Sequence, residues 1–157
     1  RDFPIAIEAY KNYLDEMKSS PDISDLFLYG RLNYYAATDS AYQDKQPTYL
    51  AEADTIFAQV AVKVPDNYLG NFWRARVNSL RDPETTQGLA KPYYEAALSI
   101  LEQKPDATKS VLVECNSYLG YNYFVKEDYN QSKQYWNKIL EIDPENETAT
   151  KALGGIK

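Results

Sequence analysis

Apolar and small residues recur along this chain at steps of four and three, the spacing that places side chains on one face of an α-helix. The clearest example covers residues 113–146. Its first half carries Tyr118, Leu119, Gly120, Tyr123 and Phe124, and its second half carries Ser132, Trp136, Ile139 and Leu140. A second Leu-Gly pair, Leu153-Gly154, follows the pair Leu119-Gly120 after 34 residues. A fixed return distance of this kind indicates a structural repeat.

The ends of the two predicted helices in this stretch carry their own signals. Glu127-Asp128 is predicted to form the turn, and Asp128 and Gln131 are placed as a capping box for the second helix. Pro144 is expected to end that helix, because the residue before a proline disfavours helical geometry. Gly120 would let the two helices approach closely. The unit is therefore predicted to be two antiparallel helices packed face to face.

The same steps recur elsewhere, at Ala6, Tyr10 and Tyr13, at Ala53, Phe57 and Val60, and at Ala90, Tyr94 and Ala97. They predict an all-α fold with helices near residues 3–18, 23–37, 48–63, 67–81, 87–103, 108–126, 129–141 and 145–155. Consecutive helices should pack antiparallel. The polar stretches 38–47 and 82–88 are expected to be loops. Pro105 follows its helix late, so the helix at 87–103 is expected to be longer than its counterparts.

The helix pair at 113–146 resembles a tetratricopeptide repeat (TPR), a unit of 34 residues with small and aromatic residues at these spacings. Gly30, Ala75 and Gly120 follow one another at intervals of 45 residues. Each takes the position at which the first helix of a pair contacts the second through a small residue. The resemblance implies an α-α superhelix, a right-handed solenoid of antiparallel helix pairs that forms a single domain over residues 1–157. Its expected parts are the second helix of a truncated repeat (2–18), three repeats (22–65, 66–105 and 107–146) and a terminal capping helix (147–157). Asn71 and Asn116 depart from the pattern, because many members have a large aromatic residue there.

Composition narrows the possible functions. The formal net charge is −6 and histidine is absent, so the chain lacks the basic footprint of a nucleic-acid-binding protein and has no His-based triad or His-ligated metal. Its single cysteine, Cys115, excludes an internal disulfide and is expected to be a small buried side chain, and Trp73 and Trp136 are expected in the core. We found no phosphate loop and no nucleophile with a base. We therefore expect no cofactor, no metal and no enzymatic activity.

The beginning of the chain lacks Met and falls inside a helical pattern, which we interpret as a fragment of a longer protein. An apolar stripe of Ala6, Tyr10, Tyr13 and Leu14 has no first-helix partner. We expect upstream repeats to cover it in the intact protein, and this chain either to form a homodimer through the N-terminal helix or to be least ordered there. No apolar run approaches the ~20 residues that span a bilayer. The tracts at 73–76 and 88–98 are similar to those of exported bacterial members, which favours the periplasm over the cytoplasm.

In the family that this chain resembles, the first helix of each pair lines the concave side, where ligands usually bind. The stripe beside the three small residues contains Phe27, Arg31, Tyr34, Phe72, Arg76, Ser79, Ser117, Tyr121 and Phe124. Arg31 and Arg76 occupy equivalent positions, and guanidinium groups bind carboxylates through two parallel hydrogen bonds. The rings would hold apolar anchors. The predicted ligand is thus a protein or peptide, with an acidic or C-terminal segment favoured.

Two alternatives compete with this interpretation. Both arginines would be unavailable if they formed ordinary intramolecular salt bridges with the many acidic residues. The chain would then be a structural spacer or self-association segment of a larger exported or assembly protein. In addition, the lysine and asparagine clamp by which some family members hold a C-terminal carboxylate is not reproduced on this stripe.

Overall fold

The computed structural model describes residues 2–17 and 19–156. Over these residues the regular structure consists of eight α-helices and one 3-10 helix, with no strand in this part of the chain. The predicted all-α fold is confirmed. Residue 18, the predicted end of the first helix, lies outside the described residues. The chain divides into two compact units, Arg1–Arg81 and Asp82–Lys157, and each is described by itself.

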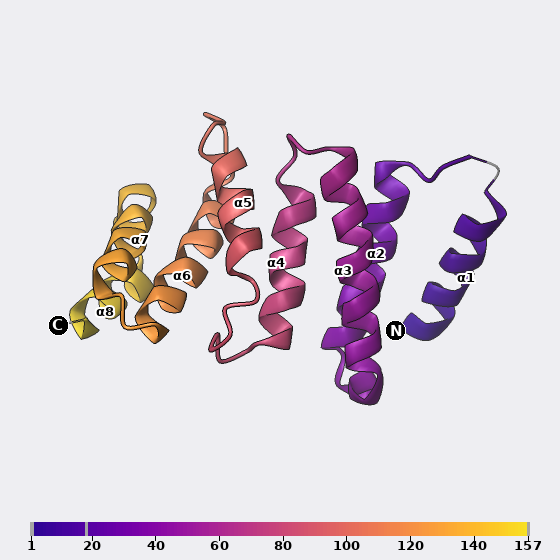
Figure 1. Ribbon diagram of the computed structural model, residues 1–157, viewed down its shortest axis with the longest axis horizontal. Coiled ribbons are helices and arrows are strands. Elements are labelled where there is room, and N and C mark those ends of the chain that lie inside the picture. Colours follow the sequence, from indigo (N-terminus) through magenta and orange to yellow (C-terminus); the bar gives the residue numbers. More distant parts are fainter. Residues whose placement is uncertain (1, 18, 157) are drawn as a thin grey trace. The chain divides into compact units, whose positions relative to one another are not determined.

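The first unit contains α1 (Phe3–Glu16), α2 (Ile23–Thr38), the 3-10 helix η1 (Ser40–Lys45), α3 (Gln46–Lys63) and α4 (Leu69–Arg81). Each α-helix packs against the next, and successive helices run in opposite directions (Figure 1). The predicted loop at 38–47 is corrected, because most of it is helical. The carboxylate of Asp39 accepts a hydrogen bond from the amide of Ala41 at 2.9 Å and begins η1.

The core of the first unit is centred on the contact between α2 and α3. A Cβ atom added at Gly30 would lie 2.8 Å from the ring of Phe57, so glycine permits the close approach of these two helices. A neighbouring apolar cluster consists of Leu26, Tyr29, Ile56 and Val60, with Ile7, Tyr10 and Leu14 of α1 packed against it. The inner face of α1 thus packs against this cluster.

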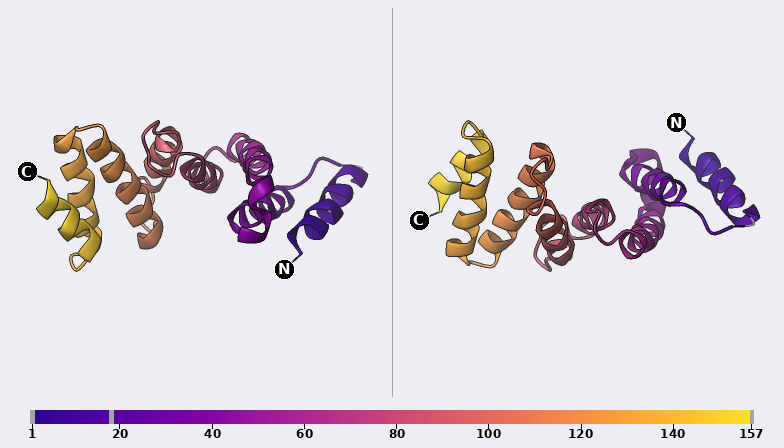
Figure 2. Two further views of the ribbon diagram at one scale, coloured as in Figure 1. Left: turned by 90° about the horizontal axis from the view of Figure 1, so that it is seen from below. Right: turned by 90° about the horizontal axis from the view of Figure 1, so that it is seen from above.

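The second unit contains α5 (Lys91–Leu101), α6 (Lys109–Val125), α7 (Tyr129–Ile142) and α8 (Glu147–Gly155). Successive helices again pack against each other, and α8 lies against α7 in both views of Figure 2. The ring of Trp136 fills the space beside Gly120, where an added Cβ would lie 2.7 Å from it. Trp136 also packs in a cluster with Ile139, Ala149 and Ile156. Its predicted place in the core, between α6, α7 and α8, is confirmed.

Hydrogen bonds fix the turn between α6 and α7. The hydroxyl of Ser132 donates to the backbone oxygen of Gly120 at 2.7 Å, and this residue is fully buried between the helices. The carboxylate of Asp128 caps α7 by accepting from the amide of Gln131 at 3.1 Å, and Glu127 takes the left-handed backbone conformation that reverses the chain.

The prediction for α5 was wrong at both ends, since this helix is shorter than 87–103. The buried carboxylate of Asp82 accepts from the backbone amides of Gln87, Gly88 and Leu89 at 3.0, 2.7 and 3.3 Å. These bonds hold the residues before α5 in a loop, and Gly88 has a φ of +72°. At the other end, the amide of Lys104 bonds the oxygen of Leu101 in a turn. Pro105 therefore follows a turn instead of a longer helix.

Candidate functional site

Trp73, on α4 of the first unit, is the centre of a cluster of aromatic rings from three helices. Its side chain is buried and stacks on Phe57 of α3, with the ring centroids 5.5 Å apart. Three rings of α2 meet it edge to face, Phe27 at 5.8 Å, Tyr34 at 5.2 Å and Tyr35 at 6.1 Å. The cluster therefore holds one surface of α2 against α4.

Two guanidinium groups lie over this cluster. The guanidinium carbon of Arg31 is 5.5 Å from the centroid of Trp73, and that of Arg76 is 4.9 Å from it. Arg31 also lies over Phe27 at 5.8 Å and Tyr35 at 5.5 Å. Cations in this position are attracted by the ring faces. Arg31 and Arg76 are thus brought together at Trp73.

Arg31 is held by rings and a hydroxyl, without a carboxylate. Its Nη2 donates to the hydroxyl of Tyr35 at 3.3 Å, and its Nε is buried with no hydrogen-bond partner. Among the residues that the structure describes, no carboxylate lies within ion-pair distance of Arg31. The alternative of an ordinary intramolecular salt bridge therefore does not hold for this arginine.

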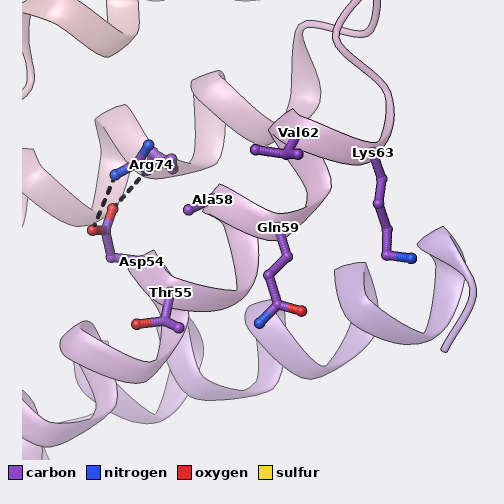
Figure 3. Close-up of a pocket in the computed structure, with 7 residues that line it drawn as sticks. All are labelled: Asp54, Thr55, Ala58, Gln59, Val62, Lys63 and Arg74. Atoms are coloured by element: carbon purple, nitrogen blue, oxygen red, sulfur yellow. Dashed lines mark hydrogen bonds and ion pairs between the residues drawn. The ribbon is translucent and has the colours of Figure 1, made fainter. Parts of the chain in front are cut away.

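Asp54, an acidic residue of the same unit, is engaged by other basic residues. Asp54 of α3 pairs with Arg74 at 3.1 Å and with Arg81 at 3.9 Å, and it also accepts from the amide of Asn78 at 3.1 Å. Figure 3 shows Arg74 reaching Asp54 at one end of an open groove of about 590 Å³ along α3, with Lys63 at the other end. This network explains how the helix pair α3 and α4 satisfies its charges without using Arg31.

The structure brings five predicted site residues of the first unit to the Trp73 cluster: Phe27, Arg31, Tyr34, Phe72 and Arg76. Phe72 is buried below Arg76, 4.5 Å from the guanidinium carbon. Sequence reasoning missed Tyr35 and assigned Trp73 to the core alone. Both stand one helical turn from an arginine, so the rule that residues three and four apart are neighbours could have found them.

The three predicted site residues of the second unit lie on α6. Tyr121 and Phe124 are exposed and line a pocket of about 220 Å³ whose floor includes Trp136 and whose far wall is formed by α8. A Cβ added at Gly155 of α8 would meet no atom within 4 Å, so glycine leaves this wall open. Ser117 is half-buried and does not line the pocket. A common groove of Arg31 and Arg76 with Tyr121 would need residues of both units, and it stays a prediction.

Within residues 2–17 and 19–156, no group of three or more acidic or cysteine side chains is placed to hold a metal ion. Cys115 is buried, as predicted. In the same described ranges, no helix is both long enough and apolar enough to cross a membrane.

Comparison with solved structures gives a match that covers nearly the whole chain. The chain is similar to the crystal structure of the C-terminal part of a TPR repeat-containing protein from Cytophaga hutchinsonii, with a TM-score of 0.82 and 32% sequence identity. The match covers 97% of this chain and 54% of that one, so the chain spans about half the length of its structural relative. No family model and no curated protein matches the chain.

Proposed function

This chain is a helical-repeat protein with the tetratricopeptide-repeat fold, and we propose that it is a non-enzymatic module that binds an acidic or C-terminal segment of a partner protein. The observation that carries the proposal is the convergence of Arg31 and Arg76 on the ring of Trp73. Two guanidinium groups thus lie against the same ring on a chain whose net charge is −6.

Arg31 is suited to a carboxylate because its geometry is set before the ligand arrives. Its guanidinium carbon lies within 6 Å of three aromatic ring centroids, and its only hydrogen bond among the described residues goes to the neutral hydroxyl of Tyr35. A carboxylate would therefore gain charge-assisted hydrogen bonds without first breaking an ion pair of Arg31. Less side-chain freedom is lost on binding when a side chain is already held in place.

The second unit supports the same proposal with an apolar element. Tyr121 and Phe124 expose 42% and 41% of their surface at the mouth of the 220 Å³ pocket. A pocket of this size accepts one apolar side chain of a partner, and buried aromatic contacts of this kind often dominate binding energy. We therefore propose that this pocket of the second unit takes an apolar side chain of a protein partner.

The second candidate function is self-association, and the outer face of α1 favours it. Ile5 and Tyr13 expose 64% and 48% of their surface, whereas Ile7, Tyr10 and Leu14 face α2 and α3. A homodimer or an upstream repeat would cover this outer face, as expected for a helical repeat that needs a neighbour. In this second proposal the chain is an assembly segment of a larger protein. We also propose that the protein is exported to the periplasm. Fractionation of cells that make the full-length protein would test this.

The binding proposal is tested with Asp- and Glu-rich decapeptides that carry a fluorescent label, each made with a free and with an amidated C-terminus. Fluorescence anisotropy should show binding that weakens as salt is raised, because the contacts are charged. The double variant Arg31→Ala with Arg76→Ala should abolish peptide binding. The double variant Arg31→Lys with Arg76→Lys should retain only part of it, because lysine cannot form the two parallel hydrogen bonds of a guanidinium group.

The matched control removes the same charge elsewhere, with Lys11→Ala and Lys45→Ala, two exposed cations of the first unit outside the cluster. If this control weakens binding as much as the arginine pair does, the attraction is one of net charge and the proposed site is wrong. Unchanged binding in the arginine double variant would favour the spacer or assembly interpretation.

A further inference from the structure

One face of α2 is open to solvent along the helix, and Arg31 lies on it. This exposed face of α2 follows helical steps of four and three and consists of Ser24, Leu28, Arg31, Tyr35 and Thr38. Arg31 is half-buried, and the other four residues are exposed. Because the five residues include one cation and no carboxylate, a ligand that reaches Arg31 along this face meets only uncharged neighbours.

Leu28 and Tyr35 border Arg31 on this face, one helical turn to either side. Leu28 exposes 47% of its surface and Tyr35 exposes 37%. Residues three or four apart on a helix have Cβ atoms about 5–6 Å apart, so both side chains are neighbours of the arginine. The hydrogen bond from Nη2 of Arg31 to the hydroxyl of Tyr35, at 3.3 Å, is itself exposed, so solvent reaches this end of the guanidinium group.

Arg31 gives the exposed leucine its significance, since a single exposed leucine is ordinary on a protein surface. Among the residues that the structure describes, Arg31 makes no ion pair. A carboxylate at this guanidinium group would be attracted more strongly if water were excluded around the pair, because the attraction between charges grows as the local dielectric constant falls. An apolar side chain packed on Leu28 would exclude that water. A segment that brings both groups therefore gains from both contacts.

We propose that Leu28 determines which acidic segments bind. The preferred segment carries a large apolar side chain two residues away from its acidic residue, and this side chain contacts Leu28 while the carboxylate pairs with Arg31. The inference rests on the proposed function, since it concerns a ligand of the same arginine. In an extended segment, side chains two residues apart point to the same side and lie about 7 Å apart, close to the spacing of Leu28 and Arg31, whereas adjacent side chains point to opposite sides.

The test uses octapeptides with acetylated and amidated ends, each with one glutamate as its sole charge, on the whole chain labelled with ¹⁵N. The first peptide has only glycine and serine at its other positions. The second and third place a leucine two residues before or two residues after the glutamate, and the fourth places it directly beside the glutamate. Since the last three peptides have the same composition, they differ in spacing alone.

In NMR titrations, the second or the third peptide should bind about tenfold more tightly than the first, the gain expected for burying one leucine side chain. The fourth peptide should bind like the first. The amide signals that shift should include those of residues 27–35, because the contacts lie on this part of α2.

Leu28→Ser should remove the tenfold preference and leave the affinity for the first peptide unchanged, because Arg31 is retained. Val62→Ser is the matched control, since Val62 is an aliphatic residue of α3 that is 80% exposed, and it should leave the preference intact. Arg31→Ala should weaken the binding of all four peptides.

The two possible failures give different results. If no peptide binds in a way that depends on Arg31, the proposed function fails and this inference fails with it. If the peptides bind through Arg31 with equal affinity, or if the preference survives Leu28→Ser, the binding function stands and the role of Leu28 is refuted. An equal gain for the fourth peptide would refute the proposed spacing. Binding that is measurable only with leucine, and is lost in both Leu28→Ser and Arg31→Ala, supports the inference.

Discussion

The ring of Trp136 occupies the space that a side chain at Gly120 would need, with 2.7 Å between the ring and a Cβ added there. Gly120→Ala should therefore force the ring to move and lower the free energy of unfolding by about 1–3 kcal/mol, the usual cost of overpacking. Gly154→Ala is the matched control, since no atom lies within 4 Å of its added Cβ, and it should be neutral or slightly stabilising. Urea unfolding followed by circular dichroism measures both. Equal effects of the two variants would contradict the close contact.

Trp136 itself is 6% exposed and contacts three helices of its unit. Trp136→Ala should leave a large cavity and lower the free energy of unfolding by about 3–5 kcal/mol. Tryptophan fluorescence of the folded chain should be shifted to the blue, because both tryptophans are buried. A loss well under ~1 kcal/mol in denaturant melts would mean that the ring faces water.

The loop before α5 should depend on the charge of Asp82. Burial tends to raise the pKa of this carboxyl group, but the amides of Gln87, Gly88 and Leu89 and the hydroxyl of Thr86 bond the charged form, so the pKa is lowered. Asp82→Asn retains the shape and loses the charge. It should cost about 1.5–3 kcal/mol at neutral pH, the range for hydrogen bonds to a charged group.

The direction of the shift also fixes the pH dependence. A lowered pKa in the folded state means that Asp82 contributes stability above its unfolded value of about 3.9, and that this contribution is lost as the pH falls through the folded value. The difference in unfolding free energy between the wild type and Asp82→Asn should therefore be constant from pH 5 to 8 and shrink below about pH 4. A constant difference down to pH 2 would show that the carboxylate is not held as described.

Tyr10 should be among the last tyrosines to ionise. Burial and the hydrogen bond from its hydroxyl to Asp25, at 3.0 Å, raise its pKa to about 12. Because the folded pKa lies above the ordinary value of about 10, this residue contributes stability below pH 10 that is lost as the pH rises towards 12. The ultraviolet titration difference between wild type and Tyr10→Phe isolates its midpoint, and Asp25→Asn should lower that midpoint. A midpoint near 10 in the wild type would contradict the assignment.

The outer face of α1 provides the test of self-association. Ile5→Asp with Tyr13→Asp should abolish any dimer seen by sedimentation velocity, because both changes place charge on the exposed apolar face. Val62→Asp, a change at an 80% exposed position of α3, is the control and should leave association unchanged. A strictly monomeric wild type whose residues 3–16 are fully protected from hydrogen exchange would contradict both the dimer and the expected low order of this helix.

Helix positions were predictable from the sequence because one stripe of each helix is buried against a neighbour. The steps between Ser132, Trp136 and Ile139 describe the buried face of α7 directly. The start of α5 was not predictable, because it depends on Asp82, whose carboxylate bonds amides five to seven residues further along the chain. Helical periodicity has no signal for such a bond.

The candidate site was predictable in part for a similar reason. Arg31 and Arg76 were found because they stand beside the small residues Gly30 and Ala75 at equivalent positions. The role of Trp73 was missed because a buried tryptophan was expected to serve only the core, whereas its ring both packs on Phe57 and supports two arginines. One tryptophan ring can be buried in the core and still contact arginine side chains. The pattern of residues along the chain does not show which of these contacts a tryptophan makes.

The 3-10 helix η1 lengthens the connection between α2 and α3 without changing how the two helices meet. Gly30 meets Phe57 after 27 residues, whereas Gly120 meets Trp136 after 16, yet the two helix pairs make the same contact between a glycine and a ring. Lengthening a connection costs little, only about 0.6 kcal/mol for each doubling of its length. The connection between α2 and α3 should therefore accept foreign sequence, such as an epitope or a short reporter peptide, between Gln43 and Asp44 without loss of the helix pair. An insertion between Glu127 and Asp128 should be tolerated less well, because it would separate the left-handed turn residue from the residue that caps α7.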